Sequence, residues 1–311
     1  MRITPFLAGT LMLSANAFAV DTQLLNMVMP EAQIMAGVNV TTAKISPFGQ
    51  YVLNQFRSDD KGLQDLISQT GFDPRQDVTE ILAATTGNPG MAGGLVLARG
   101  NFNADKIAAT ATAKGGSAVV SQYAGATLIT VDGKETKSVA FVGNSIAVIG
   151  DTASVKAALD RAGNVNSISP ALATRVQALS TTLDAWTVSL ASIGSLLPSE
   201  LGGKNGAMAQ PLQVVKNIES SSGGVKFGAN VEVSGQAVAN TAENARALAD
   251  IVRMVAGLVT MGGGQDPKMA GVAQLVQTLK VSTDGNAVNL SASVPEAQLE
   301  ALLHPAVVKT N

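Results

Sequence analysis

The sequence predicts an α+β fold built from two related halves, each an antiparallel sheet with helices packed on one face. First, a stretch that reads as turn, strand, cap and helix occurs twice, at 142–163 and at 284–303. Second, apolar residues recur at helical spacing in some segments and alternate with polar residues in others, which is typical of helices and half-buried strands. Third, pairs of Gly, Asn and Asp separate the alternating runs, as in β-hairpins. One offset relates the two copies of the repeated stretch at three positions: Gly143 and Gly285, Asn144 and Asn286, Asp151 and Ser293.

The composition limits the classes of protein to which the chain can belong. The chain has 311 residues, of which 46% are hydrophobic and 14% are charged, so it has ample material for a core and differs from a disordered chain. The net charge is −2 and Lys and Arg are scattered singly, which argues against nucleic-acid binding because that requires concentrated positive charge. Since the sequence has no cysteine, disulfides, thiolate metal sites, a Cys nucleophile and a Cys-linked lipid anchor are excluded.

Residues 1–19 are predicted to be a secretory signal peptide. Arg2 provides a short positive region, 3–15 is apolar, and Ala17-Phe18-Ala19 has the small-x-small pattern of a cleavage site. We therefore expect cleavage near Ala19–Val20 and a periplasmic or secreted protein with no transmembrane segment after signal cleavage. The alternative is a retained membrane anchor. It is disfavoured because polar residues interrupt a stretch shorter than the about 20 residues that a span needs.

The first half is expected to span 20–163. Ser46 precedes Pro47 as an N-cap precedes the first helical position, and Gly71 is a helix stop. Asp77 and Glu80 are interpreted as acidic residues of a first helical turn. Helices are predicted at 21–28, 47–56, 63–70, 77–82, 104–114 and 152–163, and strands at 34–40, 82–86, 93–99, 118–123, 127–131, 138–142 and 145–149.

The second half is expected to span 164–303, followed by a flexible tail at 304–311. Gly223-Gly224 is predicted to be a hairpin turn, and Ser293 is predicted to cap the last helix. Helices are predicted at 172–179, 211–217, 241–261, 269–279 and after 293, a helical turn at Pro198, and strands at 185–191, 218–222, 225–233, 280–283 and 286–292. The two halves share one order of elements. This favours an internal duplication over a chance agreement between two α+β segments.

The sequence carries no pattern that indicates an enzyme, a metal site or a cofactor. His304, the single histidine, lies in the predicted tail, which removes His-dependent triads and His metal sites. Ser58 and Lys61 match a Ser-x-x-Lys pattern, but they lie in a charged turn rather than on a helix that buries the lysine. The glycine clusters contain no Walker or dinucleotide fingerprint. We expect no cofactor, no metal and no catalytic residue, and a hydrolase using Ser, Thr, Asp and Lys stays a minor alternative.

The apolar face of the longest predicted helix, 241–261, is the candidate binding surface. Its residues lie opposite a charged stripe and are Leu248, Ile251, Val252, Val255, Leu258 and Val259. Such a face either packs into the core, which is favoured, or lines a hydrophobic groove. Trp186, the sole tryptophan, is interpreted as a packing residue of a core strand.

The leading hypothesis is an exported, non-enzymatic protein that binds an unknown protein partner or an apolar ligand. An envelope-associated structural protein that acts through assembly is the alternative. An apolar groove beside helix 241–261 would favour ligand binding. Long unpaired sheet edges, or a sheet continuous between the halves, would favour assembly.

Several segments of the chain are similar to those of exported bacterial proteins with a domain of unknown function. They are the Ala17-Phe18-Ala19 signal, the Ser-Pro-Phe-Gly-Gln-Tyr-Val-Leu segment at 46–53, the Gly-Phe-Asp-Pro-Arg-Gln-Asp-Val segment at 71–78, and the closing Gly-Asn and Asp-Gly hairpins. The resemblance implies duplicated α+β halves over most of the mature chain. Because its motifs are structural, it implies no activity and no catalytic residue.

Overall fold

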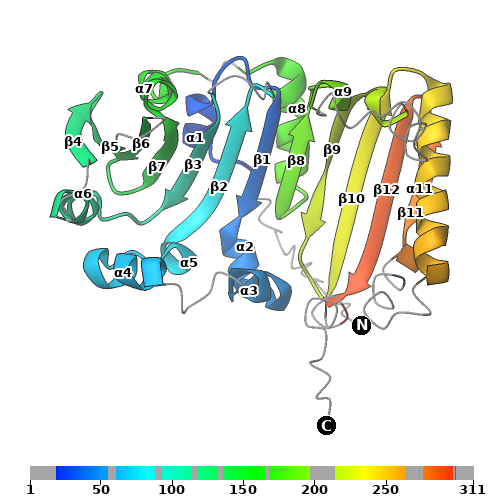
Figure 1. Cartoon of the computed structure of the whole chain (residues 1–311), viewed down its shortest axis with the longest axis horizontal. Helices are drawn as coiled ribbons and strands as arrows, with labels where there is room; N and C mark the ends of the chain where they lie inside the picture. Colours follow the sequence, from blue (N-terminus) through cyan, green and yellow to red (C-terminus); the bar gives the residue numbers. More distant parts are fainter. Residues whose placement is uncertain are drawn as a thin grey trace, which may run out of the picture.

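The computed structural model describes residues 19–54, 61–87, 93–113, 118–131, 136–165, 168–196, 214–262, 273, 276–296 and 298. Within these residues the chain forms one continuous 12-stranded sheet with helices packed against it (Figure 1). Each strand pair is antiparallel. The predicted α+β class is therefore confirmed.

Runs of helices and runs of strands follow one another along the chain. The helices are α1 (Thr22–Met27), α2 (Val40–Ile45), α3 (Pro47–Asn54), α4 (Lys61–Thr70), α5 (Pro74–Asp77), α6 (Ala104–Ala113), α7 (Thr152–Arg161), α8 (Pro170–Ser180), α9 (Ile193–Leu196) and α11 (Ala242–Gly262). The strands are β1 (Ile34–Asn39), β2 (Val78–Thr85), β3 (Leu95–Gly100), β4 (Ala118–Tyr123), β5 (Ala126–Val131), β6 (Lys137–Val142), β7 (Ile146–Asp151), β8 (Ala185–Ser189), β9 (Ile218–Lys226), β10 (Asn230–Ala239), β11 (Lys280–Asp284) and β12 (Ala287–Pro295).

The sheet is centred on the pairing of β1 with β8, in which Ala36 lies opposite Thr187. Outward from this pair the strand order is β1-β2-β3-β7-β6-β5-β4 on one side and β8-β9-β10-β12-β11 on the other. A separate sheet in each half is the sequence expectation. Backbone pairing between β1 and β8 instead joins the strands of both halves into one sheet.

In the first half, helices pack against both faces of the sheet. On β7, Val148 belongs to one core cluster and Ala147 to another, because successive side chains of a strand point to opposite faces. The first cluster includes residues of α1, α7 and α8, and the second includes residues of α2 and α6. Helices on a single face are thus too simple a picture here, since strands that are apolar on both sides need cover on both.

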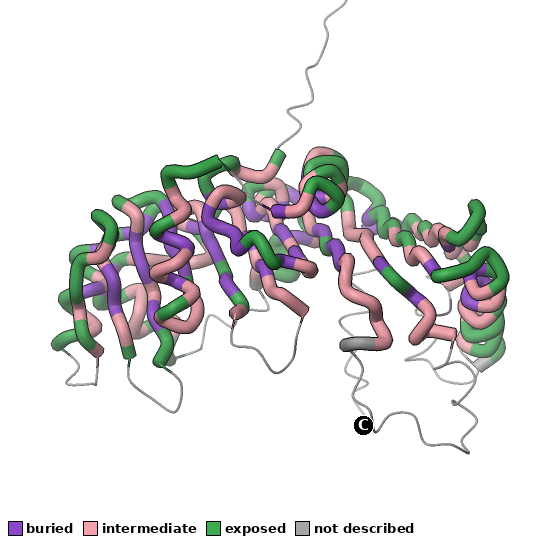
Figure 2. The backbone as a smooth tube through the Cα atoms, turned by 90° about the horizontal axis from the view of Figure 1, so that it is seen from above, coloured by how far each residue is buried: buried purple, intermediate pink, exposed green. Residues whose placement is uncertain are grey.

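At β10 and β12 of the second half, one face of the sheet is covered and the other is polar. α11 shares a core cluster with Val288 of β12, against which Ala237 and Leu290 also pack. On the opposite face of β10 and β12, Gln236 donates a hydrogen bond to Asn289 at 2.9 Å. Figure 2 shows buried positions concentrated in the first half and at the centre, and fewer of them toward the end that carries α11.

The repeated hairpin is confirmed in both copies. Gly143 lies at φ +55° between β6 and β7, and Gly285 lies at φ +56° between β11 and β12. Positive φ of this kind favours glycine, which explains the residue shared by the two turns. In the first copy Asp151 caps α7, accepting a hydrogen bond from the Ser154 N–H at 2.9 Å.

In the second copy, the prediction that Ser293 caps a helix is wrong. Ser293 lies within β12, which stays paired with β10 as far as Pro295 opposite Asn230. Helical geometry begins at Glu296. The strand is longer than its counterpart because backbone pairing with β10 continues through the position where the repeat placed a cap.

Two further local predictions are wrong. Val78 starts β2 directly after α5, so the predicted helical turn at 77–82 is a strand and Glu80 lies within it. β9 runs straight through Gly223-Gly224, and the turn to β10 follows Lys226. A Cβ at Gly223 would lie 2.8 Å from the Cα of Gly235 on β10, so glycine serves close strand approach here rather than chain reversal.

Some expectations lie outside the described residues. These are the segment 1–18, Ser58 with the turn around it, the turn at Pro198, most of the helices predicted at 269–279 and after 293, and the tail with His304.

Candidate functional site

The six predicted binding residues of α11 fall into three sets by exposure. Leu248 is buried in a core cluster with Ile218 and Val288 of the sheet. Ile251, Val252 and Val259 are half-buried. Val255 and Leu258 are exposed, at 49% and 62%. The predicted apolar face is therefore part core and part surface, and the binding role of these residues stays a prediction.

Two exposed residues of the same helix were missed by the sequence analysis. Met254 is 53% exposed and Met261 is 78% exposed. The spacing 254, 258, 261 places both on the side of the helix that carries Leu258. That spacing is visible in the sequence, but the predicted apolar face included six other residues and neither methionine.

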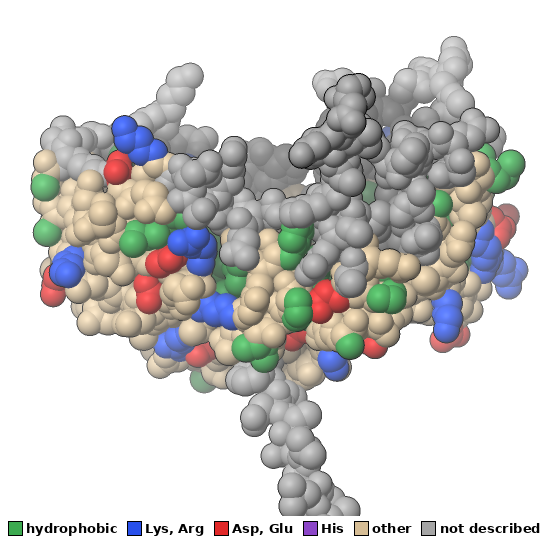
Figure 3. Space-filling model, turned by 90° about the horizontal axis from the view of Figure 1, so that it is seen from below, with side chains coloured by type: hydrophobic (Ala, Val, Ile, Leu, Met, Phe, Trp, Pro, Cys, Tyr) green, Lys and Arg blue, Asp and Glu red, His purple; other side chains and the backbone are tan. Residues whose placement is uncertain are grey.

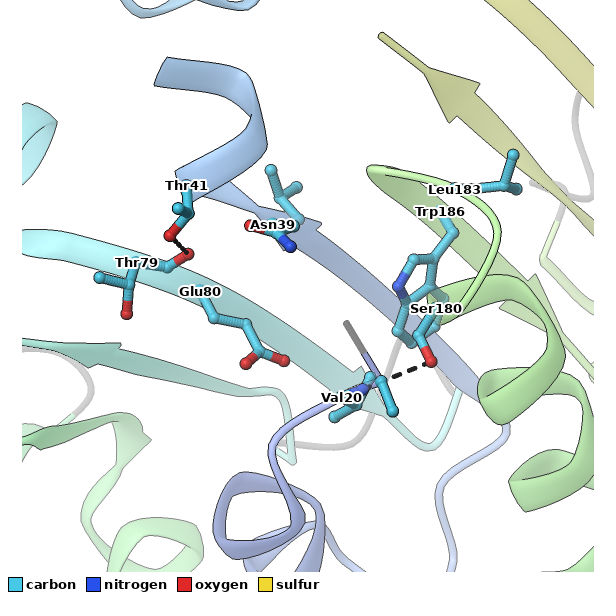
Figure 4. Close-up of a pocket in the computed structure, with 10 residues that line it drawn as sticks. Val20, Asn39, Thr41, Thr79, Glu80, Ser180, Leu183 and Trp186 are labelled. Atoms are coloured by element: carbon cyan, nitrogen blue, oxygen red, sulfur yellow. Dashed lines mark hydrogen bonds between the residues drawn. The ribbon is translucent and has the colours of Figure 1, made fainter. Parts of the chain in front are cut away.

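A second candidate site lies at the seam between the halves, beside the β1–β8 pair. A cavity of about 190 Å³ opens there (Figure 4). Residues of both halves and of the amino-terminal segment line it: Ala19, Val20, Val38, Asn39, Thr41, Thr79, Glu80, Ser180, Leu183 and Trp186.

Trp186 forms the apolar wall of this seam cavity. Its cross-strand neighbours are glycines on both sides, Gly37 of β1 and Gly224 of β9. The indole lies over Gly37, where an added Cβ would be 2.5 Å from Cε2. Trp186 is 6% exposed and belongs to the main core cluster, so its predicted packing role is confirmed.

Glu80 is the half-buried carboxylate of the seam cavity. Its Oε1 accepts a hydrogen bond from the Asp21 N–H at 3.2 Å. Burial raises the pKa of Glu80, and the nearby Asp21 carboxylate adds to this, while the Asp21 N–H and the charge of Arg99 oppose it. The sequence interpretation missed Glu80 because it placed the residue in a helix, although the alternation of 78–85 was a usable signal of a strand.

Asp21 engages the cation nearest to this carboxylate. It caps α1 by accepting the Gln23 N–H at 2.8 Å, and it pairs with the Arg99 guanidinium at 2.5 Å. Burial opposes ionisation of Asp21, but the hydrogen bonds from Arg99, Leu24 and Gln23 outweigh it and lower its pKa. Arg99 also donates to the Gln23 side chain at 2.7 Å, so its contacts go to α1 and its cap rather than to Glu80.

The amino-terminal segment bridges the two halves at this point. The Val20 N–H donates to Ser180 Oγ at the end of α8, at 3.4 Å, while the next N–H, of Asp21, donates to Glu80 on β2. Figure 4 shows Val20 between Glu80 and Ser180. Segments far apart in the sequence thus meet around one short stretch of backbone.

The seam cavity has little catalytic capacity. Ser180 is 8% exposed, and its hydroxyl donates to the Gln177 carbonyl at 3.3 Å. Within the described part of the chain, no group of three His, Cys, Asp or Glu side chains is arranged to hold a metal ion. The cavity is also smaller than the roughly 300–1,000 Å³ of typical small-molecule sites.

Larger cavities lie elsewhere; one of about 310 Å³, bordered by Leu95 and Ala157, is mainly apolar in lining, and two others are mainly polar. One of about 450 Å³ is bordered by Lys44 and Arg75, and one of about 430 Å³ by Asp77 and Lys106. None of these cavities, nor the one at the seam, is lined by α11. In Figure 3, basic and acidic side chains are intermingled on the visible face. Among the described helices, none has the length and apolar character to cross a membrane.

Comparison with known proteins gives a fold but no family. No family model and no curated protein sequence matches the chain. The structure of TP0453 in crystal form III aligns with 92% of this chain and 98% of its own, at a TM-score of 0.54 and 8% identity. Crystal form IV gives a TM-score of 0.52 at 9% identity over 91% and 97% of the two chains. At such identities the likeness shows the fold alone.

Proposed function

We propose that the protein is exported and acts without catalysis, by docking a protein partner on the outer side of α11. The observation that carries this proposal is a row of large apolar side chains that the helix leaves exposed. The row, called the α11 stripe below, consists of Met254, Val255, Leu258 and Met261, at 53%, 49%, 62% and 78% exposure. A helix on a sheet ordinarily turns polar residues to solvent, and a contiguous apolar patch indicates an interaction site.

The α11 stripe occupies the C-terminal half of the helix. Toward the N-terminal half, the outer side carries the ion pair of Arg253 with Asp250, at 2.8 Å. The sheet-facing side is held by Ala245, Leu248 and Ala249, all buried. The helix therefore has its core contacts and an apolar outer stripe at once, which supports a role for the stripe in binding.

A protein partner fits this surface better than a small apolar ligand. An enclosed apolar ligand needs a pocket, and the cavities described above lie away from α11. β11 is the end strand of the sheet and, in the described part of the chain, pairs with β12 alone. The Val281 carbonyl of β11 accepts a hydrogen bond from Arg253 of α11 at 3.1 Å, and the rest of this strand edge lies beside an exposed apolar helix side. That arrangement suits a polypeptide that adds a strand and covers the stripe.

A second copy of this chain is the alternative occupant. The sheet is continuous between the halves and ends at β4 and β11, which is the arrangement that favours assembly through sheet edges. This supports the envelope-associated structural role as the second candidate function.

We also infer an internal duplication. The two sides of the sheet share one pattern outward from the β1–β8 pair. Three strands follow in chain order, and then a hairpin follows with its second strand first: β1-β2-β3-β7-β6 on one side and β8-β9-β10-β12-β11 on the other. α1 and α8 precede the two central strands and join one core cluster, while α6 and α11 follow β3 and β10.

The proposal that the protein is exported rests on the signal pattern that ends at Ala19.

The docking proposal is tested with a photo-reactive amino acid placed at position 258 in protein expressed in its native envelope. We expect cross-linking to one partner polypeptide, lost in Met254→Asp and retained in Thr260→Asp, which adds the same charge to an exposed position off the stripe. Cross-linking to another copy, with concentration-dependent self-association, would support assembly instead. Equal labelling of many proteins in both variants, or recovery of lipid alone, would refute protein docking.

A further inference from the structure

The seam cavity lies where the sequence places the signal cleavage site. Ala19 and Val20 both line the cavity. Ala19 is exposed, whereas Val20 is half-buried and makes the hydrogen bond to Ser180. The predicted scissile bond therefore joins a residue outside the fold to the first residue that the fold holds.

Arg99 of β3 is the cross-strand neighbour of Glu80, but among the described ion pairs its guanidinium is joined to Asp21 and none includes Glu80. Glu80 receives a single backbone N–H, that of Asp21, at 3.2 and 3.4 Å from its two oxygens. Asp21 brings a like charge, and the Arg99 guanidinium is bound to Asp21 and Gln23. The Asp184 carboxylate, in the turn before β8, accepts a hydrogen bond from the Phe227 N–H at 2.6 Å. A half-buried carboxylate in such surroundings is stabilised by a nearby positive charge.

We propose that the seam cavity is the seat of the mature amino terminus, in which the α-ammonium group of Val20 pairs with the Glu80 carboxylate. This rests on the cleavage that the proposed export requires. A signal peptidase adds water across the Ala19–Val20 amide. The C–N bond breaks, the hydroxyl goes to the Ala19 carbonyl carbon, and a proton goes to the Val20 nitrogen. At neutral pH the products are a carboxylate on the departing peptide and an ammonium group on Val20.

The geometry suits this pairing. The Val20 nitrogen already lies 3.4 Å from Ser180 Oγ, and Glu80 contacts the nitrogen of the very next residue. Consecutive Cα atoms are about 3.8 Å apart, so the carboxylate lies within one residue of the new charge. An amide N–H offers one donor, whereas an ammonium offers three. The Val20 ammonium can therefore bind Ser180 and Glu80 together.

The consequence is a link between processing and the joining of the two halves. Ser180 ends α8 of the second half, and Glu80 lies on β2 of the first. An ammonium between them ties the halves through charge as well as through the β1–β8 pairing. In the unprocessed chain the same position carries a neutral amide, and within the described part of the chain no ion pair includes Glu80, because Arg99 pairs with Asp21.

The test measures the pKa of the α-amine in protein whose first residue is Val20, released in vitro from a fusion to 20–311. All described elements lie within this segment. The pH dependence of α-amine acylation by an amine-selective reagent gives the pKa, with intact mass spectrometry as the readout. An unperturbed α-amine has a pKa of about 7.7–8.0. We expect acylation of the folded protein at pH 7 to be about tenfold slower than in urea, and Glu80→Gln to abolish most of this difference.

Glu219→Gln is the matched control, because it removes one exposed carboxylate from β9, a strand that does not line the cavity. It should leave the acylation rate unchanged. Acylation as fast in the folded wild type as in Glu80→Gln would overturn the pairing, whatever the cellular fate of the chain. N-terminal sequencing of protein from the native envelope tests export separately. An uncleaved chain there would contradict the proposed export, while the in vitro pKa would still report on the cavity.

Discussion

Gly224→Ala tests why β8 and β9 can lie so close beside the seam. Gly224 pairs with Trp186, and a Cβ added to it would overlap the Ala185 carbonyl oxygen and lie 2.7 Å from the Cα of Trp186. Ordinary carbon–carbon contact is about 3.5–4.0 Å. The strands would have to separate by most of an ångström at a point where backbone hydrogen bonds hold them together.

The expected loss of stability follows from two opposing effects. Inserting a methyl group into well-packed surroundings costs about 1–3 kcal/mol, and the upper end applies because the clash is with backbone on a paired strand. Replacing glycine by alanine also restricts the unfolded chain, which stabilises by about 0.4–1 kcal/mol where the backbone conformation tolerates it. The control Gly235→Ala isolates this second effect, since its Cβ would lie 3.8 Å from the nearest atom, the Ser222 carbonyl oxygen.

Equilibrium urea unfolding followed by Trp186 fluorescence and by circular dichroism measures the difference. We expect Gly224→Ala to be less stable than Gly235→Ala by about 3 kcal/mol, seen as a lower midpoint with an unchanged slope. Coincident transitions by the two probes would justify the two-state treatment. Equal midpoints for the two variants would refute the claim that close strand approach requires glycine at position 224.

The remaining predictions concern a buried anchor, a turn and an ion pair. Leu172→Ala, at a fully buried position of α8, should destabilise by about 2–5 kcal/mol in urea unfolding, whereas Leu258→Ala on the α11 stripe should change stability by less than about 0.5 kcal/mol. Gly285→Ala should cost about 1–2 kcal/mol because φ is +56°, and Gly285→Asn should cost less because Asn tolerates that region; equal midpoints for both would contradict the turn geometry. Asp21→Asn should cost about 1 kcal/mol at pH 7, through loss of a partly exposed ion pair and of the negative charge at the N-terminus of α1, because Asn keeps the capping oxygen. Since the folded pKa of Asp21 lies below its ordinary 3.8, this stabilisation is present above that pH and is lost as the pH falls through the folded value. A thermal-melt series should therefore show the wild type and Asp21→Asn converging in acid, and a constant gap at all pH values would oppose the assignment.

The sequence predicted what local chemistry decides. The hairpin turns at Gly143 and Gly285 need positive φ, and the residue pattern records that need directly. The meander β4 to β7 followed from alternating runs separated by such turns. The long helix 241–261 followed from its periodicity, and α11 agrees with it closely.

The errors arise where a distant strand decides the outcome. Gly223-Gly224 has the composition of a turn, but pairing on both sides keeps it in β9. Ser293 has the position of a cap, but pairing with β10 keeps it in β12. No local signal reveals the β1–β8 pairing, and therefore none revealed the single sheet.

The candidate sites show the same division. Periodicity located the apolar residues of α11, but which of them reach solvent depends on which residues pack against the sheet, as Leu248 does. Glu80 became a site residue only once β2 set it opposite the amino-terminal segment, 59 positions earlier in the chain. The sequence around a carboxylate in a strand does not predict which distant segment will contact it.

The central pairing of β1 with β8 also bears on the time course of folding. Val38 pairs with Ala185, and the Val20 N–H reaches Ser180, 160 positions away. Contacts of such high sequence separation slow folding, because a long loop must close before they form. During synthesis β1 therefore keeps one open edge until β8 has emerged. Because the first half is synthesised before the second, β1, which lies in the middle of the final sheet, is for a time an edge strand. A chaperone that shields β1 would act in that interval.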